Sequence, residues 1–177
     1  MALVVAALNP TLGVAAGDVV DANDARVTHV GGVWMLDGRL ADGLLTEYGE
    51  WGELLMTAPL VHGVVDGIER RWFSNGRPES VRTFEDGRKV GVHVGWWPTG
   101  THRFRTRYVD DSFDGVNKAW YETGVQSQRL EYVKGREEGR QQMWASDGTL
   151  IVNYEMRAGR RYGMINAKPC IPSSGGM

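Results

Sequence analysis

The chain has 177 residues, 42% of them hydrophobic and 24% charged, which is the composition of an ordinary folded domain. Its net charge of −2 argues against a dedicated nucleic-acid binder, and its single cysteine excludes an internal disulfide framework and a cysteine-rich zinc site. The charge is unevenly placed, because residues 1–66 hold 2 basic and 9 acidic side chains whereas residues 67–177 hold 18 and 13.

Residues 1–17 form an apolar segment that we interpret as the remnant of a signal peptide. Val14 and Ala16 are the small residues that a signal peptidase selects, but the basic residues that normally begin such a signal are missing. A plain N-terminal strand is therefore the alternative. No run approaches the ~20 apolar residues that span a bilayer, which argues against a transmembrane protein. We expect a periplasmic or otherwise exported protein, with a cytoplasmic location as the alternative.

Residues 18–42 are predicted to lead into the main sheet. An acidic linker at residues 18–25 is followed by two short strands, Val27–Val30 and Val33–Leu36, which end at the turn Asp37-Gly38. We expect this lead-in to cover the first edge of the sheet, because an exposed edge strand tends to pair with other chains.

Residues 43–162 repeat every 24 residues, in five units of which the first is degenerate. A fixed period of this size is typical of a repeat protein, in which each unit packs against the next. The recurring glycines are predicted to form turns, and the recurring large side chains to form a buried core. The residues predicted for this core are Trp72, Trp96, Trp120, Trp144, Phe84, Tyr108 and Tyr132.

Each unit is predicted to be a β-hairpin, with a tight turn of positive φ at pairs such as Asn75-Gly76. A left-handed backbone is expected between hairpins, at Gly63, Gly87, Asp111, Gly135 and Gly159. The strand at 102–108 alternates between Phe104, Thr106 and Tyr108 on one face and Arg103, Arg105 and Arg107 on the other. No segment has a helical period. The predicted fold class is therefore all-β, an elongated and twisted antiparallel meander of stacked β-hairpin repeats.

The order of glycine, tryptophan with a second aromatic residue, glycine turn and aromatic-ended strand resembles the MORN repeat in its bacterial variant form. One unit carries this order at Gly115, Trp120, Tyr121, Gly124 and Tyr132. The resemblance covers about residues 43–163 and implies an extended sheet that serves in scaffolding, protein–protein contact or association with membrane lipid. Some bacterial members are labelled antitoxin-like. The chain lacks the dense Tyr-x-Gly and Gly-x-Gly pattern of the standard MORN signature, which argues against a lipid-binding role.

The sequence contains no recognisable catalytic, cofactor or metal motif. A phosphate loop, a Gly-x-Ser-x-Gly elbow and a His-Glu-x-x-His helix are all missing. The four histidines are scattered, and we interpret them as surface residues, although His93 and His102 lie on neighbouring strands. Asp110, Asp111 and Asp114 cluster in one loop, for which a polar surface is a sufficient account. We predict that the chain is not an enzyme and holds no cofactor or metal.

Arg103, Arg105 and Arg107 are candidate binding residues. Strands lie about 4.8 Å apart, so Arg82 or Arg129 on adjoining strands could extend these three into a positive strip that meets carboxylates or phosphates. The alternative is a solvated face whose arginines pair with acids such as Glu131.

Cys170 is the other candidate, in a tail at residues 163–177. Lys168 would lower the pKa of its thiol and raise its reactivity, whereas an inert cysteine that packs against the last strand is the alternative. The sequence thus predicts a non-enzymatic scaffold in the cell envelope that presents a sheet face to another protein. The alternatives are a thiol- or copper-related accessory that acts through Cys170, peripheral association with an anionic membrane surface, and an antitoxin-like component.

Overall fold

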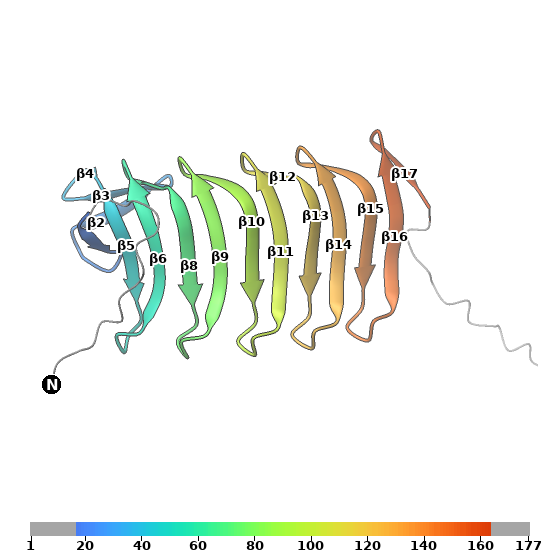
Figure 1. The fold of residues 1–177 in the computed structure, drawn as a ribbon, viewed down its shortest axis with the longest axis horizontal. Coiled ribbons are helices and arrows are strands. Elements are labelled where there is room, and N and C mark those ends of the chain that lie inside the picture. Colours follow the sequence, from blue (N-terminus) through green and yellow to red (C-terminus); the bar gives the residue numbers. More distant parts are fainter. Residues whose placement is uncertain (1–16, 164–177) are drawn as a thin grey trace, which may run out of the picture.

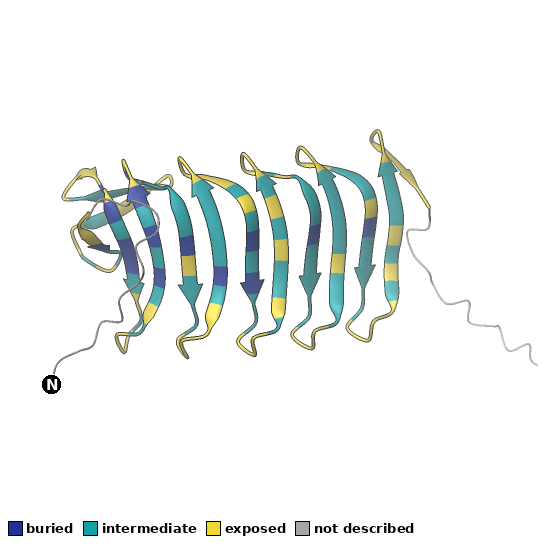
Figure 2. Cartoon of the chain, viewed as in Figure 1, coloured by how far each residue is buried: buried dark blue, intermediate teal, exposed yellow. Residues whose placement is uncertain are grey.

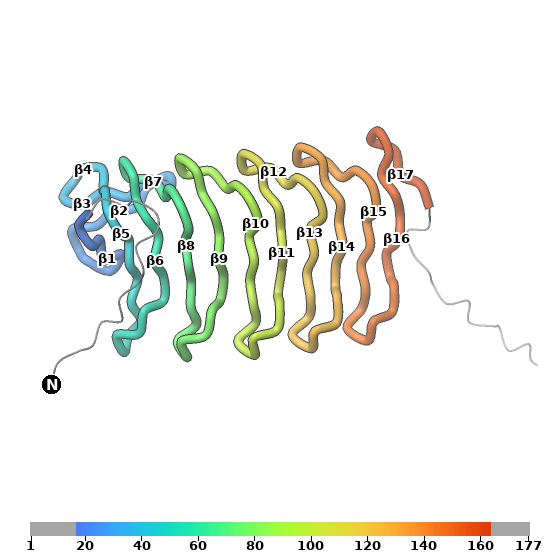
Figure 3. Tube along the Cα trace, viewed as in Figure 1, coloured from blue at the N-terminus to red at the C-terminus, as the bar shows by residue number. Residues whose placement is uncertain are grey.

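The computed structural model describes residues 17–163, so that the apolar N-terminal segment and Cys170 lie outside the described residues. The described chain forms a long antiparallel meander and a small second sheet, and it is not closed into a barrel (Figures 1 and 3). The predicted all-β fold of repeated hairpins is confirmed. In chain order the strands are β1 (Val19–Asp21), β2 (Val27–Val30), β3 (Val33–Leu36), β4 (Arg39–Leu40), β5 (Gly43–Tyr48), β6 (Leu54–Val61), β7 (Val64–Val65), β8 (Gly67–Trp72), β9 (Pro78–Glu85), β10 (Arg88–Trp96), β11 (His102–Val109), β12 (Ser112–Phe113), β13 (Gly115–Trp120), β14 (Gln126–Val133), β15 (Arg136–Trp144), β16 (Leu150–Arg157) and β17 (Arg160–Tyr162).

The main sheet follows the chain from one hairpin to the next. Its strand order is β1-β5-β6-β8-β9-β10-β11-β13-β14-β15-β16-β17, with the short strands β7 and β12 paired beside β6 and β11. Within each hairpin the glycine that starts the unit lies opposite the large residue that ends it, as in Gly91 with Tyr108 and Gly115 with Tyr132. An aromatic ring can cover a bare glycine on the neighbouring strand, and this pairing accounts for the equal spacing of the two residue types.

The lead-in covers the first edge of the main sheet, but with a different strand from the two that we predicted. Its strands β2 and β3 have the predicted bounds, but together with β4 they form a separate sheet that packs on a face of the meander. The edge is instead protected by β1, which pairs in parallel with β5 and comes from the segment interpreted as a linker. The apolar side chains Val27, Trp34 and Leu36 explain this placement, because they bury themselves against the first hairpin.

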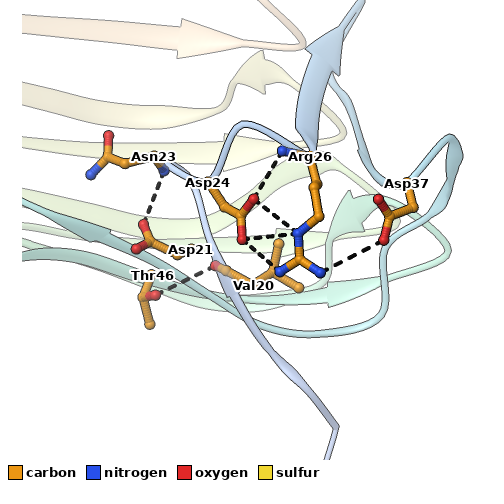
Figure 4. A network of polar contacts seen from close by, with 7 residues as sticks. All are labelled: Val20, Asp21, Asn23, Asp24, Arg26, Asp37 and Thr46. Carbon is orange, nitrogen blue, oxygen red and sulfur yellow. Dashed lines mark hydrogen bonds and ion pairs between the residues drawn. The ribbon is translucent and has the colours of Figure 1, made fainter.

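A polar network holds the connection between β1 and β2 (Figure 4). The guanidinium of Arg26 lies 2.7 Å from a carboxylate oxygen of Asp24 and 3.9 Å from one of Asp37. The hydrogen bond from Arg26 lowers the pKa of Asp24 to about 2. The main-chain N–H of Asn23 donates to Asp21 at 2.9 Å, and Thr46 on β5 donates its hydroxyl to Val20. These contacts fix the path of the lead-in from the sheet edge to the sheet face.

Two kinds of turn alternate along the meander. Turns at one end are two-residue turns in which both residues have positive φ, for example Asp86 with Gly87 and Lys134 with Gly135. They confirm the predicted left-handed positions at Gly63, Gly87, Asp111, Gly135 and Gly159.

The turns at the other end are longer than predicted. In the first full unit the N–H of Phe73 donates to Arg77 and the N–H of Gly76 donates to Phe73, and only Gly76 has positive φ. The same two bonds recur 24, 48 and 72 residues later. Asn75 does not adopt the left-handed conformation; its side chain accepts a hydrogen bond from the N–H of Arg77 at 3.0 Å. The Asn-Gly pair therefore contributes one glycine and one side-chain acceptor to a wider turn.

The predicted buried tryptophan core is wrong. Trp72, Trp96, Trp120 and Trp144 are only half-buried. The fully buried apolar residues within 17–163 all belong to the lead-in and the first hairpin (Figure 2); they are Val20, Ala41, Leu45, Met56, Ala58 and Leu60. The reason is that only this hairpin is covered by a second layer, whereas the later units form a single sheet whose faces remain open to solvent.

The residue that follows the tryptophan links neighbouring units. The indole N–H of Trp97 donates to the carbonyl of Trp120 at 3.0 Å, and the hydroxyl of Tyr121 donates to the carbonyl of Trp144 at 2.9 Å. The double-aromatic pattern of the repeat thus supplies a hydrogen bond to the next unit as well as apolar area.

The position of the core predicts where truncation destabilises the fold. Leu45→Ala should lower the free energy of unfolding by about 2–5 kcal/mol, because Leu45 is 1% exposed and its loss leaves a cavity. Leu54→Ala on the neighbouring strand is the control, since this side chain is 37% exposed and its truncation should cost only about 0.5 kcal/mol. Urea unfolding measures both, and equal losses would contradict this assignment of the core.

Candidate binding faces of the sheet

The strand register assigns side chains to the two faces of the meander. Residues that lie opposite each other on antiparallel strands share a face, so Phe104, Thr106 and Tyr108 lie on the same side as Gly95 and His93. We call this side the aromatic face. The other side is the arginine face, and it carries Arg103, Arg105 and Arg107 as the sequence predicted.

The arginine face presents cations that have no acidic partner. Arg105 and Arg107 are exposed, and neither forms an ion pair within residues 17–163. Arg103 differs, because its guanidinium lies 3.5 Å from Glu79 and also near the ring of Trp97, 5.8 Å from the centroid. Two of the three predicted binding residues are therefore free to meet an external anion.

The neighbours of these arginines differ from the ones that we predicted. Arg105 lies opposite Lys118 on β13, and Lys118 lies opposite Arg129 on β14, so three cations follow one another across adjacent strands. Arg129 is paired with Glu131 and contributes less free charge. Arg82 is on the aromatic face, where its guanidinium lies 3.4 Å from Glu69, so it does not belong to the strip. Lys118 takes the place that we had assigned to Arg82.

A repeated column of polar residues is buried on the aromatic face. Its members stand two residues after the glycine that starts each unit, and they are 0–8% exposed. They are Glu69, His93, Asn117 and Gln141, which we call the polar column. Leu45 occupies the same position in the first hairpin, where the lead-in sheet covers it. The later units thus bury a polar residue where the first hairpin buries an apolar one.

The polar column satisfies main-chain groups where pairing between units is broken. The strands β9 and β10 lose their register between Val90 and Val94, and the other contacts between units are interrupted at the equivalent place. His93 Nε2 lies 2.9 Å from the carbonyl of Thr83, and Gln141 donates its side-chain N–H to the carbonyl of Glu131 at 2.7 Å.

Asn117 fulfils the same role with the opposite polarity. Its side-chain carbonyl accepts the main-chain N–H of Arg107 at 3.0 Å. The three main-chain partners are themselves 24 residues apart, at Thr83, Arg107 and Glu131. Because a buried main-chain group without a partner costs about 1–3 kcal/mol, these side chains stabilise three of the four breaks in the sheet.

The fourth break lies between β6 and β8 and needs no side chain as hydrogen-bond donor or acceptor. Its equivalent main-chain position is Pro59, which has no N–H, and its carbonyl accepts the N–H of Asp66 at 3.0 Å. The column residue there is Glu69, which is free to pair with Arg71 at 3.2 Å and with Arg82 at 3.4 Å.

His93 is not the surface residue that we predicted. It is 2% exposed, with its ring 5.6 Å from that of Phe84 and 4.6 Å from that of Tyr108. Burial lowers the pKa of His93 because it disfavours the charged imidazolium, and the nearby charges of Arg82 and Lys89 lower it further. The ring is therefore neutral, and its Nε2–H donates to Thr83.

Aromatic rings continue from His93 along the same face. Tyr108 lies 5.1 Å from Phe113, and Phe113 lies 5.1 Å from Tyr132, measured between ring centroids. Burial raises the pKa of both tyrosines, which stay protonated at neutral pH. Next to Phe113 and Tyr132 the aromatic face is hollowed by a cavity of about 330 Å³, whose floor includes Ala119 and Leu130.

The acidic loop is used for local structure. Arg88 donates to Asp110 at 2.7 Å, the N–H of Lys89 donates to Asp111 at 2.9 Å, and the N–H of Lys134 donates to Asp114 at 3.2 Å. These bonds tie consecutive turns together. Within the described part of the chain no group of three or more histidine, cysteine, aspartate or glutamate residues is placed to hold a metal ion.

Comparisons with known proteins identify no relative. No family model, no curated protein and no solved structure matches the chain. Residues 17–163 also contain no helix long and apolar enough to cross a membrane.

The burial of His93 predicts a pH dependence of stability. In the unfolded chain its pKa returns to about 6.5, above the folded value, so the unfolded state binds the extra proton as the pH falls. The free energy of unfolding that the buried neutral His93 contributes is fully present above about pH 6.5 and is lost as the pH falls below that value. We expect wild type to lose more free energy of unfolding between about pH 7.5 and about pH 5.5 than His93→Gln, which carries the residue found at Gln141.

Urea unfolding at the two pH values measures this difference. His102→Gln is the control, because His102 is exposed and its replacement should leave the slope of wild type unchanged. Parallel losses in wild type and His93→Gln would show that the imidazole takes up its proton equally well in both states.

Proposed function

We propose that this chain is a non-enzymatic scaffold that binds an acidic segment of another protein through its arginine face. The observation that carries the proposal is the row of Arg105, Arg107 and Lys118, which no carboxylate within residues 17–163 neutralises. A folded domain gains little from unpaired cations on a sheet, whereas an anionic partner would gain from them.

The spacing of these cations favours an extended peptide as the partner. Arg105 and Arg107 are two residues apart on one strand, or roughly 6.8 Å, and Lys118 is one strand away, at about 4.8 Å. Alternate residues of an extended segment have the first spacing, so carboxylates at every second position would meet the arginines, whose planar groups bind carboxylates with two hydrogen bonds.

The other predictions from the sequence relate to this proposal in different ways. The MORN resemblance supports a scaffold, and the antitoxin-like label, the envelope location and a role for the Cys170 thiol stay predictions. Association with an anionic membrane is the second reading of the same cations, because a basic surface is attracted to acidic lipid headgroups. The test below separates it from binding to protein.

Charge reversal tests the proposal. Arg105→Glu/Arg107→Glu should abolish the capture of proteins that the wild type binds from extracts of its own cell, because it replaces attraction with repulsion. The control Arg136→Glu/Arg160→Glu makes the same change of net charge at exposed residues outside the row and should bind as wild type does. Captured proteins should be released as salt rises, since exposed charges are screened.

Two results would count against the proposal. The first is that every specifically captured protein still binds the Arg105→Glu/Arg107→Glu variant. The second is that wild type captures no protein but binds vesicles that contain anionic lipid, with loss of binding in the same variant. That second result would assign the arginine face to a membrane surface.

A further inference from the structure

We infer that the cavity on the aromatic face is a second binding site, which takes an uncharged, extended segment of a partner protein with a large apolar side chain. This site lies on the opposite side of the sheet from the arginine face and does not depend on the function proposed above. The inference rests on a comparison of the repeat units with one another.

The first hairpin shows how this face is covered. There the lead-in strand β3 lies against the sheet, with Trp34 and Leu36 packed on the buried cluster to which Met56, Ala58 and Leu60 belong. The main chain of β3 is also held, because the N–H of Trp34 donates to the carbonyl of Gly63 at 2.7 Å. An extended apolar segment is therefore the natural occupant of this face.

Part of the cavity lining consists of repeat equivalents of the covered residues and of Val65, which packs against them. A shift of 48 residues converts Met56, Ala58 and Val65 into Phe104, Thr106 and Phe113. A shift of 72 residues converts Ala58 and Leu60 into Leu130 and Tyr132, and the rest of the lining is Asn117, Lys118, Ala119 and Gln128. The same positions that bury apolar area under β3 thus meet again farther along the sheet, where no described residue covers them.

The position of the repeat that Ala119 occupies explains why the cavity lies in this unit. In successive units it is Glu47, Arg71, Gly95, Ala119 and Met143. The ring of Phe104 occupies the space above Gly95, since a Cβ built there would lie 2.2 Å from it. Above Ala119 the residue equivalent to Phe104 is Gln128, which leaves the hollow beside it open.

The chemistry of the lining defines the ligand. Lys118 is the one charged residue of the lining, and the register directs its side chain to the arginine face. The side chains that reach the cavity from the aromatic face are apolar or uncharged, which selects against the acidic segment expected on the other side of the sheet. A volume of about 330 Å³ accommodates one large side chain, such as the tryptophan that β3 provides in the first hairpin. The two faces would therefore select partners of different chemistry.

Selection from an unbiased library tests this site. Random twelve-residue peptides displayed on phage are panned against the full-length wild type, and synthetic copies of the enriched peptides are titrated by fluorescence anisotropy. We expect a family of peptides without net charge, with apolar residues at alternate positions and an aromatic residue among them.

The variants use residues that the repeat already accepts. Ala119→Met fills the hollow with the residue found at Met143, and Leu130→Arg places in it the residue found at Arg82. Each variant should bind the enriched peptides with an affinity at least about tenfold lower than that of wild type. Ala119→Ser is the control of equal size and should bind as wild type. Arg105→Glu/Arg107→Glu should also bind as wild type, because it alters only the opposite face.

Three outcomes would overturn the inference. No peptide family is enriched, or the enriched peptides bind Ala119→Met and Leu130→Arg within about twofold of wild type. The third is that only acidic peptides are enriched and that they lose binding to Arg105→Glu/Arg107→Glu alone. This last result would support the proposed function while it removes the site on the aromatic face. Circular dichroism checks that each variant is folded. If either Ala119→Met or Leu130→Arg does not fold, the other variant still tests the site.

Discussion

The structure depends on the hydrogen bonds that three members of the polar column make at breaks in the sheet. Hairpins that follow one another in a meander can pair along their full length only if the sheet stays regular, and here pairing between units is interrupted once per repeat. His93, Asn117 and Gln141 supply the missing partners from the same position of three consecutive units. The break in strand pairing and the side chain that bonds to it therefore both recur every 24 residues. This hydrogen bond explains why a polar side chain is buried in a sheet of one layer.

The single layer explains why the units differ in stability and in what they offer to other molecules. The first hairpin is covered by β3, and together with the lead-in it contains all the fully buried apolar residues of the described chain. The later hairpins retain the same shape with both faces open, one apolar and hollowed, the other basic. In a repeat array each unit is stabilised mainly by contacts with its neighbours. Units without a second layer therefore remain folded although both of their faces are exposed. The later hairpins therefore present two chemically distinct faces.

Most of the fold was predictable from the sequence, because the signals are periodic. The spacing of the glycines and aromatic residues predicts the hairpins, and the alternation at 102–108 places Arg105 and Phe104 on opposite faces. The location of the apolar core was not predictable from hydrophobicity, since it depends on the packing of the lead-in sheet on the first hairpin. The other buried positions were missed because their residues are polar. Their equal spacing of 24 residues was visible, but only the interrupted pairing explains their burial. Lys118 was missed because its neighbour across the strand depends on a register that the turn lengths set.

Hydrogen exchange at one main-chain amide tests the role of the polar column most directly. In wild type the N–H of Arg107 is bonded to the side chain of Asn117. Asn117→Leu introduces the residue that the first hairpin has at this position, Leu45, and removes the acceptor. We predict that the amide of Arg107 then exchanges about tenfold faster or more, while the amides of the paired residues Phe104 and Ala119 keep their protection. Unchanged protection at Arg107 in the folded variant would contradict the account, because the break would then be stable without the side chain that closes it.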